Sequence, residues 1–269
     1  MRLHLIAAAA FVLPAFGCSE AIEQDEASAT ATSALQAQSQ GGVTDGVLDV
    51  DAPDGLAPDP EDAAKAVAEK DARALRPAGC AVKTRDGAVV TIALHGCTGP
   101  FGKIALDGTL VATFSKTATN VLHVDIADGG DLAANGASFH YAAGVDVTYA
   151  PGTRKLDYHG HSDGTTKRGV AFDRHTDLAI VADVDKKCVS IDGVSKGSLG
   201  RFDLDLTIDG FHGCESACPT AGSAKATLRT PNREIDVEVD FDGSDRAHVK
   251  APKHAFDVAL ACEDAEAAQ

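Results

Sequence analysis

The sequence predicts an all-β protein, an antiparallel meander that forms a sandwich or barrel, is stapled by disulfides and follows a disordered N-terminal tether. Three observations lead to this expectation. Apolar and polar residues alternate in several runs, Asp-Gly pairs recur between the runs, and the chain of 269 residues contains seven cysteines. No amphipathic helical pattern follows residue 77. The predicted β domain covers residues 78–262.

The N-terminus has the pattern of an export signal. A single charged residue, Arg2, precedes the apolar run 3–16, and this run leads into Leu-Pro-Ala-Phe-Gly-Cys at 13–18. The run is shorter than the ~20 residues that a membrane span needs. The stretch resembles the lipobox of bacterial lipoproteins, which implies that residues 1–17 are removed and that Cys18 receives a lipid anchor.

This resemblance also implies a location. Ser19 stands where an Asp often retains lipoproteins in the inner membrane, so the outer membrane of a bacterial cell envelope is expected. Ala15 replaces the usual Leu three residues before the cysteine. The alternative is therefore ordinary signal-peptide cleavage, which would leave Cys18 as an unmodified N-terminal residue.

The segments between the signal and the β domain differ in composition. Residues 18–60 are rich in Ala, Ser, Thr, Gln, Asp and Pro, which predicts a disordered acidic tether. Residues 61–77 are Ala-rich and end at Pro77, which favours a short helical segment. Residues 263–269 form an acidic tail.

The β domain is predicted from period-two patterns. Alternation is clearest at 122–126, 202–208 and 235–241, and it is typical of antiparallel strands that are solvated on one face. Asp-Gly is a strong hairpin signal, so about twelve to sixteen short strands are expected between the pairs. These pairs lie at 86–87, 107–108, 128–129, 163–164, 192–193, 209–210 and 242–243.

Cysteine number supports an oxidising environment. Apart from Cys18, six cysteines remain, an even set that implies disulfides in an exported chain. Spacing favours Cys80–Cys97, followed in chain order by Cys188–Cys214 and Cys218–Cys262. The alternative is a zinc site built on the Cys-x-x-x-Cys at 214–218.

Charge restricts the classes of partner. The net charge is −16, and residues 19–79 contribute −9 of it, from thirteen acids and four bases. An acidic chain without a basic stripe argues against nucleic acid as a partner. The expected contacts are therefore the membrane, through the lipid anchor, and an unidentified protein or other envelope component.

Histidines form the first candidate site. His159 and His161 are two residues apart, which places both imidazoles on one face of a strand and suits zinc or copper. His140, His175, Asp157 or Asp163 would complete the ligand set from a neighbouring hairpin. The competing interpretation is that these are exposed strand and turn residues without a ligand.

Two further patterns resemble functional sites. Asp125, Asp128 and Asp131, and a second trio at 240, 242 and 245, offer oxygen ligands for calcium, although Asp is also common at turns. Gly-Val-Ser-Lys-Gly at 193–197 matches a nucleophile elbow, but a strand-like pattern follows it in place of a helix. Ser195 is therefore interpreted as a turn residue, and no catalytic residue is assigned.

These observations predict a cell-envelope lipoprotein that presents a β-rich binding or structural domain, with no catalytic activity and no cofactor. The alternative is a metal-binding module, or a metal-dependent hydrolase, centred on His159 and His161 and using Zn, Cu or Ca.

Overall fold

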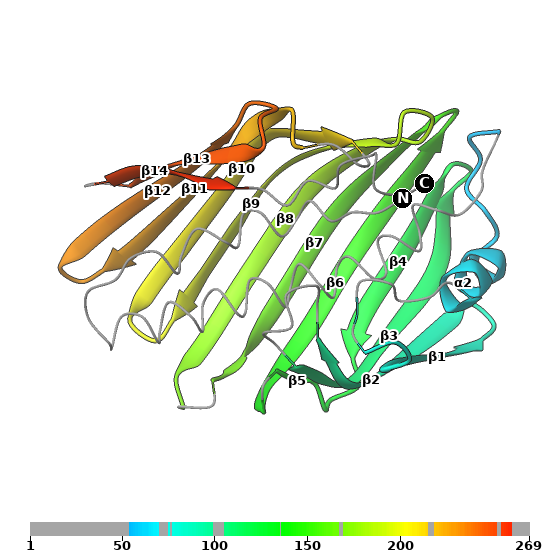
Figure 1. Ribbon diagram of the computed structural model, residues 1–269. Coiled ribbons are helices and arrows are strands. Elements are labelled where there is room, and N and C mark those ends of the chain that lie inside the picture. Colours follow the sequence, from blue (N-terminus) through cyan, green and yellow to red (C-terminus); the bar gives the residue numbers. More distant parts are fainter. Residues whose placement is uncertain are drawn as a thin grey trace.

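The computed structural model describes residues 54–69, 75, 77–98, 105–134, 136–166, 169–214, 218–251 and 254–259. The predicted signal peptide, Cys18, most of the predicted tether, Cys262 and the acidic tail lie outside these residues. The described chain forms one antiparallel sheet in which consecutive strands are neighbours (Figure 1), and this confirms the predicted all-β meander.

The strands differ widely in length. In chain order, the described strands are β1 (Ala81–Asp86), β2 (Val89–Thr98), β3 (Ala105–Ala118), β4 (Val121–Asp128), β5 (Ala133–Ala134), β6 (Ala137–Ala150), β7 (Thr153–Thr165), β8 (Ala171–Asp183), β9 (Cys188–Leu199), β10 (Phe202–Cys214), β11 (Ala221–Thr230), β12 (Arg233–Phe241), β13 (Arg246–Ala251) and β14 (His254–Ala259). The short β5 pairs with β3 and β6, and β4 pairs directly with β6.

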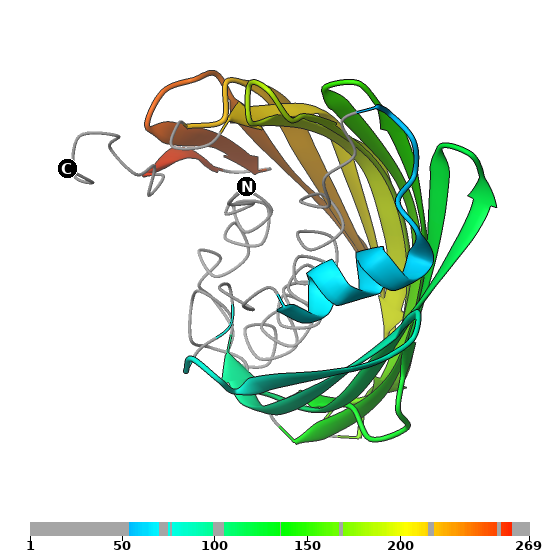
Figure 2. The same ribbon diagram turned by 90° about the vertical axis from the view of Figure 1, so that its right-hand side faces the viewer.

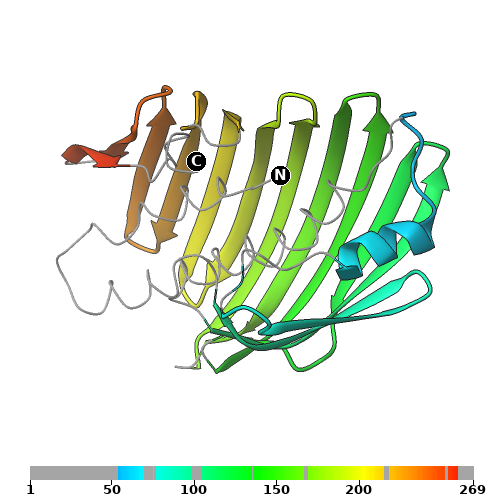
Figure 3. The same cartoon turned by 45° about the vertical axis from the view of Figure 1, so that its right-hand side comes forward.

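The sheet is strongly curved. Seen from the end, it has a C-shaped cross-section with the helix inside the curve (Figure 2), and the turned view in Figure 3 shows the same helix over the first strands. The strand order runs from β1 to β14, and no described pairing joins these two edges. The described strands therefore form a single curved sheet and not two facing sheets.

One face of the sheet is mainly apolar because the pairing keeps the two-residue period in phase. Buried polar side chains, among them Arg174 and Ser195, interrupt it. Val147, Leu156 and Ile180 stand opposite one another on β6, β7 and β8, and each is at most 3% exposed. Burying one such side chain is worth about 1.5–3 kcal/mol. The residues between these positions point to the convex face, which is polar.

The only helix in the described residues, α2 (Pro60–Glu69), lies in the segment predicted to be helical. It starts where Asp59 accepts a hydrogen bond from the Glu61 backbone N–H at 2.9 Å, and Pro60 occupies the first turn, where its missing N–H costs nothing. Its buried face packs against β1, β2 and β3 through Ala63, Ala64 and Val67. In the described part of the chain, no helix combines the length and apolarity that crossing a bilayer requires.

The residues just before α2 also belong to the folded unit. Ala57 is 4% exposed, donates its N–H to the Thr119 carbonyl at 3.0 Å and accepts a bond from Lys116 Nζ at 2.7 Å. The end of the segment that composition assigns to the tether is thus attached to the turn between β3 and β4.

The Asp-Gly pairs at 86–87, 128–129 and 242–243 lie at strand ends, as predicted, but the other four do not. The pairs at 107–108, 163–164, 192–193 and 209–210 lie inside strands, so the strands are longer than expected. Gly193 allows close packing, since a Cβ there would lie 2.4 Å from the Asp177 carbonyl oxygen. Gly210 has φ +58° at the bulge of β10. Hairpin turns are formed instead at 119–120, 151–152, 200–201 and 231–232.

Two disulfides pair as predicted. Cys80, just before β1, is bonded to Cys97 of β2, and Cys188 of β9 is bonded to Cys214 of β10. Each bridge is expected to contribute about 2–4 kcal/mol. Cys218 is also disulfide-bonded. Its predicted partner, Cys262, lies outside the described residues.

The apolar row provides a test of the fold. Leu156 is fully buried, so Leu156→Ala should lower the free energy of unfolding by about 2–5 kcal/mol. Val181→Ala, on the convex face of β8 with 41% exposure, serves as the control and should cost less than about 1 kcal/mol. Equal losses in urea unfolding would contradict the assignment of the two faces.

Candidate metal centre

Histidine and aspartate side chains gather on the convex face of β4, β6, β7 and β8. They occupy the positions that alternate with the buried residues, and most of them are in contact across the strands. We refer to this region as the His–Asp surface, made of His123, Asp125, Asp146, His159, His161, Asp173, His175 and Asp177.

Three members of the His–Asp surface form a compact group. His161 Nε2 lies 3.0 Å from Asp173 Oδ2, and His175 Nδ1 lies 3.3 Å from Asp173 Oδ1. The rings of His161 and His175 are stacked with centroids 4.3 Å apart. One ligand atom from each of the three residues lies within 4.8 Å of the other two.

Strand register explains why these residues meet. His161 of β7 and His175 of β8 are directly paired, so their side chains leave the sheet side by side. Asp173 precedes His175 by two residues and therefore shares its face. The Asp-x-His pattern at 173–175 is the sequence signal for the third ligand, but only the pairing of β7 with β8 places it against His161.

The other two predicted histidine ligands lie elsewhere. His159 Nδ1 is 2.6 Å from Asp177 Oδ1, and His140 Nδ1 is 3.7 Å from Asp128 Oδ2. Of the four predicted ligands, the structure thus brings His161 and His175 together, and it adds Asp173. His159 lies on the same face of β7 as His161, as expected, but it pairs with Asp177 of β8 and not with Asp173.

The His161–Asp173–His175 group has the donor set of a transition-metal site. Zinc takes imidazole nitrogen at about 2.0–2.1 Å and carboxylate oxygen at about 2.0–2.2 Å. One ligand atom from each residue lies within 4.8 Å of the other two, so the three are close enough to share one ion. Three protein ligands would leave one tetrahedral position open for water or for a group from a partner.

The aspartates considered for calcium are already hydrogen-bonded to other groups of the chain. Asp128 accepts the Gly130 N–H at 2.7 Å and the Tyr141 N–H at 2.8 Å, and Asp131 accepts the Thr109 N–H at 2.8 Å. None of the candidate aspartates belongs to a group of metal-ligand atoms within the part of the chain that the structure describes. Asp128 and Asp131 thus satisfy backbone N–H groups near turns, whereas Asp125, on β4, lies 3.1 Å from His123.

The aspartates of the second trio, at 240, 242 and 245, are also engaged by other groups of the chain. Asp242 accepts the Ser244 N–H at 3.0 Å, and this bond is the main reason that the pKa of Asp242 falls to about 2. Asp240 pairs with Lys250 at 2.6 Å, and Asp245 lies 3.9 Å from Arg246. The carboxylates are thus directed at different partners.

Ser195 is neither a turn residue nor part of a nucleophile elbow. It lies inside β9 on the buried face, 4% exposed, which corrects the expectation of a turn. Its Oγ donates to the His175 carbonyl at 3.1 Å and accepts from Arg174 Nε at 2.7 Å and from Thr176 Oγ1 at 2.6 Å. The hydroxyl therefore accepts a hydrogen bond from the buried guanidinium of Arg174. Burial lowers the pKa of this guanidinium to about 10.

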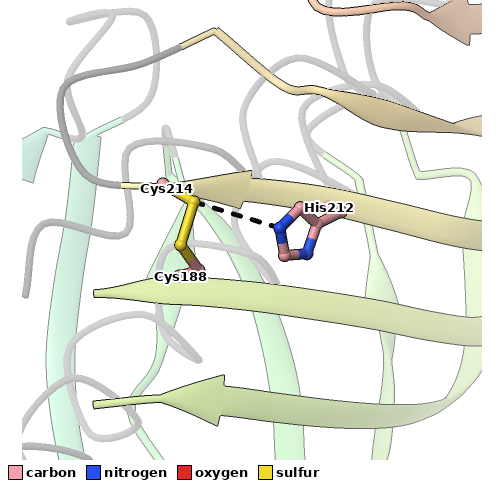
Figure 4. Close-up of side chains that lie close together, drawn as sticks. All are labelled: Cys188, His212 and Cys214. Carbon is pink, nitrogen blue, oxygen red and sulfur yellow. Dashed lines mark hydrogen bonds between the residues drawn. A yellow bond between two sulfur atoms is a disulfide. The ribbon is translucent and has the colours of Figure 1, made fainter. Parts of the chain in front are cut away.

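A second group of ligand atoms lies at the far end of β9 and β10. It consists of Cys188, His212 and Cys214, and the two cysteines are joined by the disulfide (Figure 4). His212 Nε2 lies 3.9 Å from Cys214 Sγ, and Nδ1 lies 2.9 Å from Ser190 Oγ. This group was not among the sites predicted from the sequence.

Two histidines of the convex face lie between pairs of carboxylates. His123 is 2.8 Å from Asp146 and 3.1 Å from Asp125, and the hydrogen bond to Asp146 is the largest cause of its raised pKa. His248 is placed similarly, and its pKa is raised chiefly by the hydrogen bond to Asp257. Protonation of either imidazole completes a charge-assisted pair across strands.

Comparison with known proteins found no matching family model, no similar curated protein and no similar solved structure. Functional assignment therefore depends on the geometry of this chain.

The raised pKa of His123 predicts a pH dependence of stability. The stabilisation is fully present below the unfolded value of about 6.5, and it is lost as the pH rises through the raised folded pKa. His123→Asn should thus destabilise the protein by about 0.2–1 kcal/mol at pH 6 and by less at pH 8. Asp146→Asn should weaken the same pH dependence, which unfolding in urea at both pH values would measure. A cost of either variant that is the same at the two pH values would contradict the assignment.

Proposed function

We propose that this protein is an exported lipoprotein of a bacterial cell envelope, in which a lipid on Cys18 anchors a β-sheet domain with a binding or structural role. The observation that carries the proposal is the sheet itself, whose long strands present a largely polar convex face. The lipobox-like sequence before Cys18 supports the anchor. The disulfides Cys80–Cys97 and Cys188–Cys214 support an oxidising location.

The placement of the polar groups favours binding over catalysis. The side chains of His161, Asp173 and His175 are 40%, 52% and 65% exposed. Catalytic groups usually act in sites that exclude water, because there a pKa can be shifted and charges interact strongly. Exposed, regularly spaced imidazoles and carboxylates suit the recognition of a partner surface or an ion. The partner is an envelope component, and nucleic acid is disfavoured by the net charge of −16.

The anchor can be tested by fractionation. The full-length chain should be recovered with membranes, and Cys18→Ala should move it to the soluble exported fraction or leave it as the uncleaved precursor. Labelling with a fatty-acid analogue should give signal for the natural chain and none for the variant. Mature Cys18→Ala protein retained in washed membranes would overturn the lipid anchor, and loss of label without a change in location would show another means of attachment.

A second function, divalent metal binding, is favoured by the His161–Asp173–His175 group. Its three ligand atoms already lie within 4.8 Å of one another, a convergence that His159 does not share. Two imidazoles and one carboxylate suit zinc or copper better than calcium, which takes six to eight oxygen ligands. The domain would then present an exposed metal ion with an open position to its partner.

The metal site predicts a selective effect of substitutions on the oxidised chain. His161→Ala and His175→Ala should each weaken zinc binding at least tenfold, measured by isothermal titration at pH 7.5, and Asp173→Asn should weaken it less. His159→Ala is the matched control, because it lies on the same face of β7 but bonds to Asp177. An equal loss in the control would move the centre to His159, and no zinc binding by the natural chain would exclude the second function.

A further inference from the structure

We propose that reduction of the Cys188–Cys214 disulfide creates a zinc site, in which the two cysteine thiolates and the imidazole of His212 bind the ion. This site is distinct from the His161–Asp173–His175 group and does not depend on the function proposed for it. The strands β9 and β10 hold all three ligands, so the sheet forms the site without a loop rearrangement.

The register of β9 and β10 places the ligands on one face. Cys188 pairs with Cys214, and Ser190 pairs with His212, two residues away along each strand. Residues two apart on a strand share a face, so the four side chains form a rectangle. Sγ of Cys188, Sγ of Cys214 and a ring nitrogen of His212 all lie within 4.8 Å of one another.

Ser190 orients the imidazole as a metal site requires. Its Oγ lies 2.9 Å from His212 Nδ1, while Nε2 is on the sulfur side, 3.9 Å from Cys214 Sγ (Figure 4). In the tautomer that donates Nδ1–H to Ser190 Oγ, the Nε2 lone pair is directed to the sulfurs. Metal-ligating histidines almost always have such an outer hydrogen bond on the second ring nitrogen.

The chemistry balances with a dithiol as the reductant. The dithiol transfers two electrons and two protons to the Cys188–Cys214 bond, which breaks to two thiols, while the dithiol itself becomes a disulfide. Zn²⁺ then displaces one proton from each thiol and forms two Zn–S bonds without changing its oxidation state. In tetrahedral geometry with Zn–S of about 2.3 Å, the sulfurs lie about 3.8 Å apart.

The other described disulfide provides an internal comparison, because its second cysteine also ends a His-Gly-Cys sequence. At 95–97, however, the register shifts between Leu94 and Cys97, and Gly96 has φ +60°. This bulge breaks the alternation that would place His95 beside the sulfurs. Among the described residues, the metal-ligand groups include His212 with its disulfide but not His95. The same three residue types thus give a site only where the strand continues without a bulge.

The experiment uses the full chain carrying His161→Ala and His175→Ala, which removes the other metal group. Zinc is titrated into the oxidised protein and into protein reduced with dithiothreitol and freed of it under anaerobic conditions, and bound metal is measured by mass spectrometry. Reduction should create a site that retains one zinc per chain through gel filtration. Cobalt(II) as a spectroscopic substitute should give a thiolate charge-transfer band at that site.

Matched variants distinguish the proposed site from thiols in general. Adding Cys188→Ser and Cys214→Ser should abolish the new site although the other cysteines remain. His212→Ala should weaken zinc binding at least tenfold, and Ser190→Ala should weaken it about 10–100-fold, the usual effect of removing an outer hydrogen bond. His95→Ala, the control at the bulged His-Gly-Cys, should leave the affinity unchanged.

Three results would overturn the proposal. One is zinc binding by the reduced chain that persists without Cys188 and Cys214 or is indifferent to His212. The second is loss of the β-sheet signal in circular dichroism when the natural chain is reduced, because the proposal requires paired strands to hold the ligands. The third is zinc binding at His212 by the oxidised chain carrying His161→Ala and His175→Ala. The site would then be independent of redox state, and the proposed role of reduction would be wrong.

Discussion

The structure depends on one constraint, the two-residue alternation of side chains across a sheet built from neighbouring strands. A slip of one residue in any pairing would move the whole apolar set of that strand to the solvent face. The row through Val147, Leu156 and Ile180 is buried because the pairings of β6, β7 and β8 agree in phase. The same phase places His161 and His175 together on the opposite face. Core and candidate site are therefore two consequences of one register.

Bulges are the points at which this constraint is locally relaxed, and they decide which chemistry the sheet can support. An extra residue in one strand reverses the faces of the residues beyond it. At Gly96 it separates a histidine from the neighbouring disulfide, whereas His212 lies beyond the bulge of β10 and remains in phase with Cys214. Identical local sequences thus acquire different surroundings, and only the pairing of strands distinguishes them.

Sequence patterns predict the features that depend on neighbours along the chain. The alternation at 235–241 corresponds to β12, and the close spacing of Cys80 and Cys97 predicts their bridge. Features that depend on register are less accessible. The Asp-Gly pair at 192–193 predicts a turn, but Gly193 lies inside β9, where its missing side chain allows β8 and β9 to approach closely. The addition of Asp173 to the histidine pair follows from the pairing of β8 with β7, which no local pattern specifies.

The groups that pair with carboxylates on the convex face differ along the sheet, and this difference changes which ligands each part of the face could bind. Around β10 to β13 the acidic side chains pair with permanent cations, as in Arg229 with Asp205 and Glu234 and in Lys250 with Asp240. Around β7 and β8 imidazoles occupy the equivalent place. Lysine and arginine offer no lone pair, whereas an imidazole can release its proton near neutral pH and bind a metal ion. The convex face therefore pairs carboxylates with permanent cations at positions around β10 to β13 and offers imidazoles as well, in greatest number on β7 and β8.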